Sequence, residues 1–121
     1  MTLKILVTGN LDCPYQLVKD KLDIILSKVS SELEIISFGY TRIDRHATTY
    51  AAANGLRYTV LEPDFKTDGS KAPNERNKRA IDLSDHCVIF GSNPYIMGLT
   101  RQKPTMKVRQ VGHVERARRV Q

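Results

Sequence analysis

The sequence has little cysteine. Only Cys13 and Cys87 occur among the 121 residues, and neither stands in a CxxC pattern or at a His/Cys spacing that would ligate zinc. Two isolated cysteines of this kind are typical of free thiols in a reducing compartment. We therefore expect free thiols, no metal site and no cofactor.

Long apolar runs are also missing. Ile5-Leu6-Val7 and Ile24-Ile25-Leu26 are short, whereas a spanning helix needs about 20 apolar residues. The first residues lack the apolar run of a secretory signal. We therefore expect a soluble, cytoplasmic protein with no membrane partner. A chain that is 40% hydrophobic and 26% charged is typical of one globular domain.

Charge is distributed unevenly along the chain. Residues 1–100 hold 12 basic and 12 acidic residues, whereas residues 101–121 hold seven basic residues and Glu115 alone, so this end carries the formal net charge of +6. Such asymmetry favours a polyanionic partner, although basic termini are also commonly solvated. Two roles remain open: attraction of a nucleic-acid backbone through Arg116, Arg118 and Arg119, or packing against a second copy in a homo-oligomer.

The fold follows from alternating strand and helix patterns. Short apolar runs that end in turn residues predict strands at 3–8, 34–38, 57–62 and 85–90. Apolar residues at helical spacing predict helices over 14–30 and 73–83 and a third that closes at Asn54-Gly55. Parallel pairing with right-handed crossovers then gives a three-layer α/β sandwich in the order 3-2-1-4. The polar segment 63–72 is expected to be a long loop.

Two patterns after residue 94 are harder to assign. A short helix is expected near Ile96-Met97 and an extended piece at Met106 to Val111. The extended piece makes the sheet one of four or five strands. We expect one domain over residues 3–100, with residues 101–121 as a basic tail or extension.

The loops that follow the strands are the expected binding region. Parallel strands point their carboxyl ends at one edge, and ligands favour the crevice where the strand order reverses, here between strands one and four. Gly9, Gly39 and Gly91 stand in these loops, where glycine would let the backbone approach a phosphate. The alternative is that each glycine merely turns the chain.

Three motifs together resemble the SLOG superfamily, and most of all its small YpsA/YspA-like branch. They are ILVTG at 5–9, the spacing of Gly39, Asp44 and Ala47, and the P-D-F-x-x-x-G-x-K-A-x-x-x-R-N pattern from Pro63 to Asn77. The resemblance covers residues 3–91. It implies a Rossmann-like domain, with a mainly parallel sheet, that binds a nucleotide or a nucleotide-derived small molecule.

The chain departs from the family pattern in two loops. Asn10-Leu11 stands where the family commonly has Ser-Arg, so a cation is missing from the first loop. Phe38 and Arg42 replace two glycines of the second loop. Because a guanidinium binds phosphate bidentately, we expect Arg42 to supply the missing cation.

The resemblance and the loop positions together predict a set of ligand contacts. For Arg76 the alternative is a surface ion pair with Glu75 or Asp82, and for Asp44 it is a simple helix cap. Tyr40 and Tyr95 could stack on a base or be plainly exposed. The expected contact residues are Thr8, Gly9, Asn10, Gly39, Arg42, Asp44, Arg76, Asn77, Gly91 and Ser92.

Three functions fit these observations. Ligand binding, as a sensor or a sequestering module, is our first hypothesis. The second is hydrolysis of a nucleotide N-glycosidic bond, for which Asp44, Asp12 and Glu62 are candidate carboxylates, although none has a signature that separates a base from a cap. The third is a nucleic-acid-associated protein that acts through the basic tail.

Overall fold

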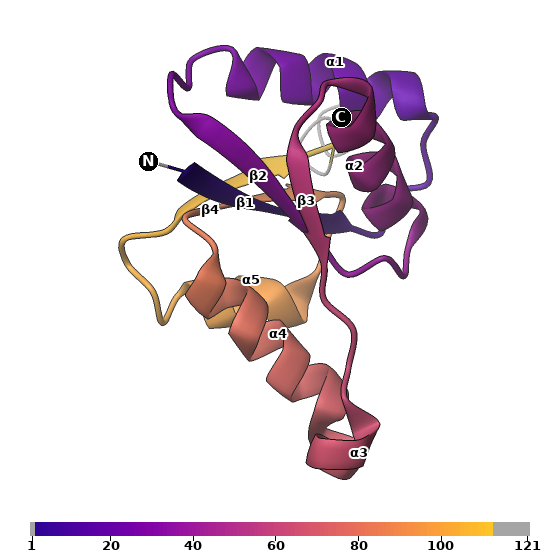
Figure 1. Ribbon diagram of the computed structural model, residues 1–121, viewed down its shortest axis with the longest axis vertical. Coiled ribbons are helices and arrows are strands. Elements are labelled where there is room, and N and C mark those ends of the chain that lie inside the picture. Colours follow the sequence, from indigo (N-terminus) through magenta and orange to yellow (C-terminus); the bar gives the residue numbers. More distant parts are fainter. Residues whose placement is uncertain (1, 113–121) are drawn as a thin grey trace, which may run out of the picture.

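Five parallel strands in the order β3-β2-β1-β4-β5 form one sheet in the computed structural model, which describes residues 2–112 (Figure 1). Helices α1 and α2 cover one face, and α4 and α5 cover the other (Figure 1). The predicted three-layer sandwich and the order 3-2-1-4 are therefore confirmed. The strands are β1 (Thr2–Gly9), β2 (Glu32–Ser37), β3 (Arg57–Val60), β4 (His86–Phe90) and β5 (Lys107–Val111). The main helices are α1 (Tyr15–Leu26), α2 (Arg42–Ala53), α4 (Ala72–Leu83) and α5 (Pro94–Thr100).

The central strands are buried on both faces. On β1, Ile5 and Val7 belong to the core cluster beneath α1 and α2, whereas Leu6 belongs to the cluster on the opposite face. Successive side chains of a strand point to opposite faces, so a strand covered on both sides is an unbroken apolar run. The sheet therefore separates two apolar layers and presents its carboxyl ends along one edge.

The segment expected to be a long loop is partly helical, and that prediction was wrong. It contains a single-turn helix, α3 (Phe65–Asp68), followed by a 3₁₀ turn, Gly69–Lys71. The Asp64 carboxylate accepts a hydrogen bond from the Thr67 amide at 3.2 Å and caps this turn. One turn is too short to show helical periodicity, which is why the pattern gave no sign of it.

The domain extends beyond residue 100. β5 pairs in parallel with β4, and Met106 is buried in the same core cluster as α4. The expected boundary at residue 100 is therefore corrected, because the sheet takes up residues 107–111. The Lys103 ammonium donates to the carbonyls of Ile81, Asp82 and Ser84 at 2.9, 3.1 and 2.7 Å, so it caps the end of α4. Arg116, Arg118 and Arg119 lie outside the described residues.

Residues 2–112 contain neither a membrane-spanning helix nor a metal-binding cluster. No helix there combines the length and the apolarity needed to span a bilayer. No group of three His, Cys, Asp or Glu side chains there is arranged to hold a metal ion. Both cysteines are buried and unpaired, and burial raises the pKa of the Cys87 thiol to about 12.

Candidate functional site

The carboxyl ends of β1 and β4 pack directly against each other. A Cβ added at Gly9 would lie 1.9 Å from the Phe90 carbonyl oxygen. That same oxygen accepts hydrogen bonds from the amides of Asn10 and Leu11 at 3.0 and 3.1 Å. Gly9 is therefore required by the contact between two backbones. This supports the reading in which the glycine shapes the chain.

The loop after β4 is closed in the same way. The Asn10 side-chain oxygen accepts from the Ser92 amide at 2.8 Å, and the Gly91 amide donates to the Val111 carbonyl at 2.7 Å. A Cβ at Gly91 would lie 2.4 Å from the Asn10 oxygen. Four amides of these two loops, those of Asn10, Leu11, Gly91 and Ser92, are thus already paired within the protein. Five predicted contact residues lie here, away from the cleft described below: Thr8, Gly9, Asn10, Gly91 and Ser92.

Arg42 faces the first loop. Its guanidinium pairs with the Asp12 carboxylate at 3.1 Å, and the two side chains are 59% and 85% exposed. An exposed pair of this kind contributes little to stability. The cation that we expected at the ligand is therefore engaged at the surface, outside the cleft.

A cleft of about 620 Å³ opens beside the ends of β2 and β3. Two other hollows on the protein measure about 210 and 230 Å³. Of these three hollows, which are lined by residues that the structure describes, the larger cleft alone falls within the range of roughly 300–1,000 Å³ that is usual for small-molecule sites. Its lining comes from the loop after β2, the connection from β3 to α3, and the first turns of α4: Phe38, Gly39, Tyr40, Glu62, Pro63, Phe65, Pro73 and Arg76.

Arg76 is the cation of this cleft. Its guanidinium carbon lies 4.3 Å from the centroid of the buried Phe38 ring, and its Nε donates to the Asn77 side-chain oxygen at 3.1 Å. No carboxylate of residues 2–112 lies within 4.0 Å of the guanidinium. Burial lowers the pKa of Arg76, and the charge of Asp44 acts in the opposite direction.

The alternative reading of Arg76 as a surface ion pair is wrong for the described residues. Glu75 instead approaches the Lys78 ammonium, at 3.5 Å. A partly buried guanidinium with no carboxylate within 4.0 Å has lost water without gaining a direct ion pair, and the charge of Asp44 acts on it only from farther away. Such a group is available for a ligand that carries negative charge.

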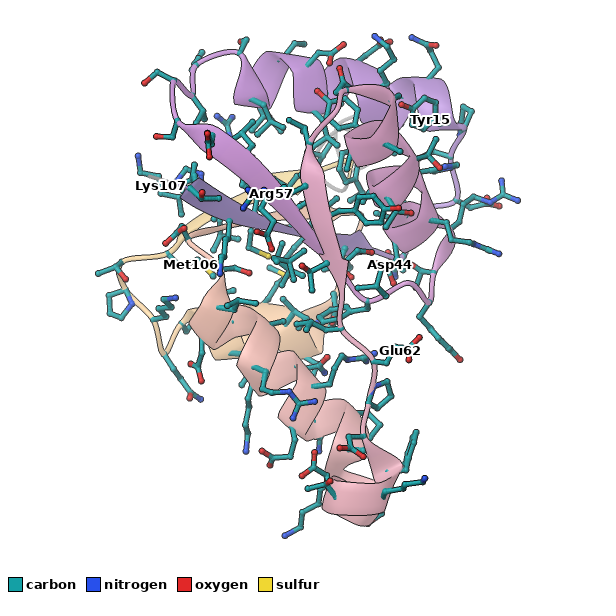
Figure 2. The ribbon with its side chains drawn as sticks, viewed as in Figure 1. Tyr15, Asp44, Arg57, Glu62, Met106 and Lys107 are labelled. Atoms are coloured by element: carbon teal, nitrogen blue, oxygen red, sulfur yellow. The ribbon has the colours of Figure 1, made fainter. Side chains whose placement is uncertain are left out.

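Asp44 holds the loop that carries Tyr40. It is 1% exposed and forms a capping box with Thr41 at the start of α2. Its Oδ2 accepts from the amides of Tyr40 and Thr41 at 3.0 and 2.9 Å. Figure 2 shows Asp44 at this helix end, near the carboxyl edge of the sheet. The geometry is that of the helix cap considered as the alternative for this residue.

The second oxygen of Asp44 has no such partner. Oδ1 is buried and makes no hydrogen bond with residues 2–112. Because protein encloses it, it is not open to a ribose hydroxyl in this conformation. An unpaired buried carboxylate oxygen is costly unless charge compensates it. The nearby Arg76 supplies positive charge, so the two residues form one electrostatic unit at the edge of the cleft.

Two exposed aromatic side chains line the cleft. Tyr40 is 80% exposed and Phe65 is 59% exposed, and both line the opening. Large exposed aromatic groups around a cleft are typical of binding surfaces. Tyr95 is also exposed but lies on α5, and it does not line this cleft.

Sequence reasoning missed two contributions to the site. It treated Phe38 as the loss of a glycine, whereas the ring supports Arg76. It also did not select Phe65, although that residue stands in the P-D-F pattern that carried the family resemblance. Of the predicted residues, the structure brings Gly39 and Arg76 together in the cleft lining, with Asp44 and Asn77 as their immediate supports.

Comparisons of the chain with protein-family models, characterised proteins and solved structures found no match. The resemblance to the SLOG superfamily therefore rests on the sequence motifs.

Proposed function

We propose that the cleft binds a nucleotide or a nucleotide-derived small molecule and that the protein acts as a sensing or sequestering module. The volume is sufficient for such a ligand. The lining combines apolar rings with a few polar groups, the combination typical of small-molecule sites. Its position at the carboxyl edge of a parallel sheet is also usual for nucleotide ligands.

The observation that supports this proposal most strongly is the absence of a direct carboxylate partner for Arg76 among residues 2–112. Its guanidinium lies over the Phe38 ring and has no carboxylate within 4.0 Å in the described part of the chain. A phosphate would supply the missing anion and accept two parallel N–H bonds. The Phe38 ring restricts the orientation of the guanidinium, which lowers the entropic cost of binding.

The aromatic rings of the cleft are suited to the base of the ligand. Tyr40 and Phe65 offer faces on which a base can stack. Stacking of a base on an aromatic side chain contributes about 1–3 kcal/mol. A phosphorylated nucleoside satisfies both the guanidinium and the rings, whereas inorganic phosphate satisfies the guanidinium alone.

Calorimetric titration tests the proposal. We expect nucleoside monophosphates to bind the wild type and Arg76→Ala to lower their affinity at least tenfold. Arg79→Ala is the matched control, because Arg79 lies on the same helix but pairs with Asp68 at 3.4 Å, outside the cleft. Equal losses in both variants, or no binding by the wild type across mono-, di- and cyclic nucleotides, would contradict the proposal.

Hydrolysis of the N-glycosidic bond is the second candidate function. It requires a carboxylate that can activate water near the anomeric carbon. Among the three carboxylates considered from sequence, Glu62 lines the cleft, whereas Asp12 pairs with Arg42 and Asp44 caps α2. Release of free base from a nucleoside monophosphate, lost in Glu62→Gln, would favour this function. Quantitative recovery of the intact nucleotide would favour binding.

A further inference from the structure

We infer that the cleft selects guanine nucleotides and that Glu62 is the residue that recognises the base. This inference rests on the nucleotide-binding function proposed above and adds the identity of the base to it. It follows from where Glu62 is held, from what its carboxylate lacks, and from which nucleobases can satisfy it.

The backbone around Glu62 is fixed on both sides. The Leu61 amide donates to the Ser37 carbonyl at 2.8 Å, which continues the β2–β3 pairing up to the residue before Glu62. Pro63 follows, and a proline restricts the preceding residue to extended conformations. Figure 2 shows Glu62 on the connection that runs from β3 towards α3. The side chain therefore starts from a defined point at the cleft.

The Glu62 carboxylate has no partner in residues 2–112. It lines the cleft, is exposed, and makes no hydrogen bond or ion pair there. It lies more than 4.0 Å from the Arg76 guanidinium, which lines the same cleft. The cleft thus presents an anion and a cation that do not neutralise each other. A ligand that fills it meets both groups.

The requirements of the two groups differ. Arg76 offers donors only and calls for an anion such as phosphate. Glu62, when ionised, offers acceptors only and calls for N–H or O–H donors. Tyr40 and Phe65 line the same cleft and are exposed, so their rings are available to a flat base. The complementary ligand therefore has a phosphate at one end and a flat donor edge at the other.

Guanine is the common base with such an edge. Its Watson–Crick edge carries N1–H beside the 2-amino group, so one carboxylate can accept two parallel bonds. Adenine and cytosine each place one amino group beside an unprotonated ring nitrogen, which a carboxylate repels. Uracil and thymine place one N–H between two carbonyl oxygens. Reading a base through this edge is a general mode of recognition.

A titration with three purine monophosphates tests the inference. We expect GMP to bind at least tenfold more tightly than AMP, as is usual for a bidentate contact to a base. IMP lacks the 2-amino group and should bind with intermediate affinity. Glu62→Gln should weaken the preference for GMP, because a glutamine amide is uncharged and has one acceptor oxygen in place of the two that a carboxylate offers to N1–H and the 2-amino group.

The control is Glu75→Gln, which removes the same charge from a residue that approaches Lys78 and does not line the cleft. It should leave the ratio of GMP to AMP affinity unchanged. Equal binding of GMP and AMP, or an unchanged ratio in Glu62→Gln, would overturn the inference. In that case Arg76-dependent binding would still stand. Failure of every nucleotide to bind the wild type would overturn the proposed function and this inference together.

Discussion

The Arg76 guanidinium carbon lies 4.3 Å from the centroid of the Phe38 ring. This contact joins the loop after β2 to the start of α4, two segments that are far apart in the sequence. A cation over an aromatic face is worth about 0.5–1 kcal/mol at an exposed site and more when desolvated. The contact holds a charged group ready in the cleft without neutralising it.

A residue kept for binding should contribute little to folding. We expect Arg76→Leu to lower the free energy of unfolding by no more than about 1 kcal/mol, because the lost cation–π contact is offset by relief of a desolvated charge. The same variant should lose nucleotide affinity at least tenfold. Urea denaturation and calorimetry measure the two quantities. A loss of stability well above 2 kcal/mol would mean that Arg76 is chiefly structural.

Asn10, in the paired loops at the ends of β1 and β4, should behave in the opposite way to Arg76: it should contribute to stability and not to binding. Asn10→Ala removes the acceptor of the Ser92 amide, which should cost about 0.5–1.5 kcal/mol of stability. Nucleotide affinity should stay within twofold of the wild type, because Asn10 does not line the cleft. If the variant keeps its stability but binds nucleotide more weakly, the ligand binds in the crevice between β1 and β4 instead of the cleft.

His86 makes stability depend on pH. Burial lowers its pKa below 6.5, Lys107 lowers it further, and Asp85 acts in the opposite direction. Protonation is therefore less favourable in the folded state, so this contribution is present above about pH 6.5 and is lost as the pH falls through the folded pKa. We expect wild type to lose more stability than His86→Gln between pH 7.5 and 5.5. Parallel urea titrations of the two proteins at both pH values would show equal losses if the expectation is wrong.

The last strand of the sheet, β5, limits how far the chain can be shortened from its C-terminal end without loss of stability. Removal of all residues after Gln102 deletes β5 and the buried Met106, so we expect a large loss of thermal stability. Removal of residues 113–121 keeps every residue of the described sheet in the chain and takes away Arg116, Arg118 and Arg119. If the tail attracts nucleic acid, this shorter deletion should abolish a salt-dependent affinity for duplex DNA or RNA. Affinity that survives the deletion would exclude that role.

Much of the fold could be predicted because its signals are local. Apolar runs that end in glycine mark β1 and β4, and the right-handed crossover then fixes their parallel neighbours. β5 could not be placed this way. Lys107 and Arg109 interrupt its apolar residues, and its position depends on pairing with β4.

The site was harder to predict than the fold. The R-N pair of the motif indicated Arg76, but the separation of the edge into a closed and an open part depends on contacts across the chain. The Asn10 side chain reaches a backbone amide 82 residues away, and no local pattern encodes that. The role of Phe38 could not be predicted either, because it depends on the position of Arg76 in the folded protein.

The most direct test of the account is a backbone amide NMR titration of the wild-type protein with GMP. We expect the largest shift changes to cluster at residues 38–41, 61–66 and 74–77, around the cleft. The changes at residues 9–12 and 91–93 should be small, because these two loops are paired with each other. Shifts concentrated at residues 9–12 and 91–93, with none around Arg76, would contradict the central claim.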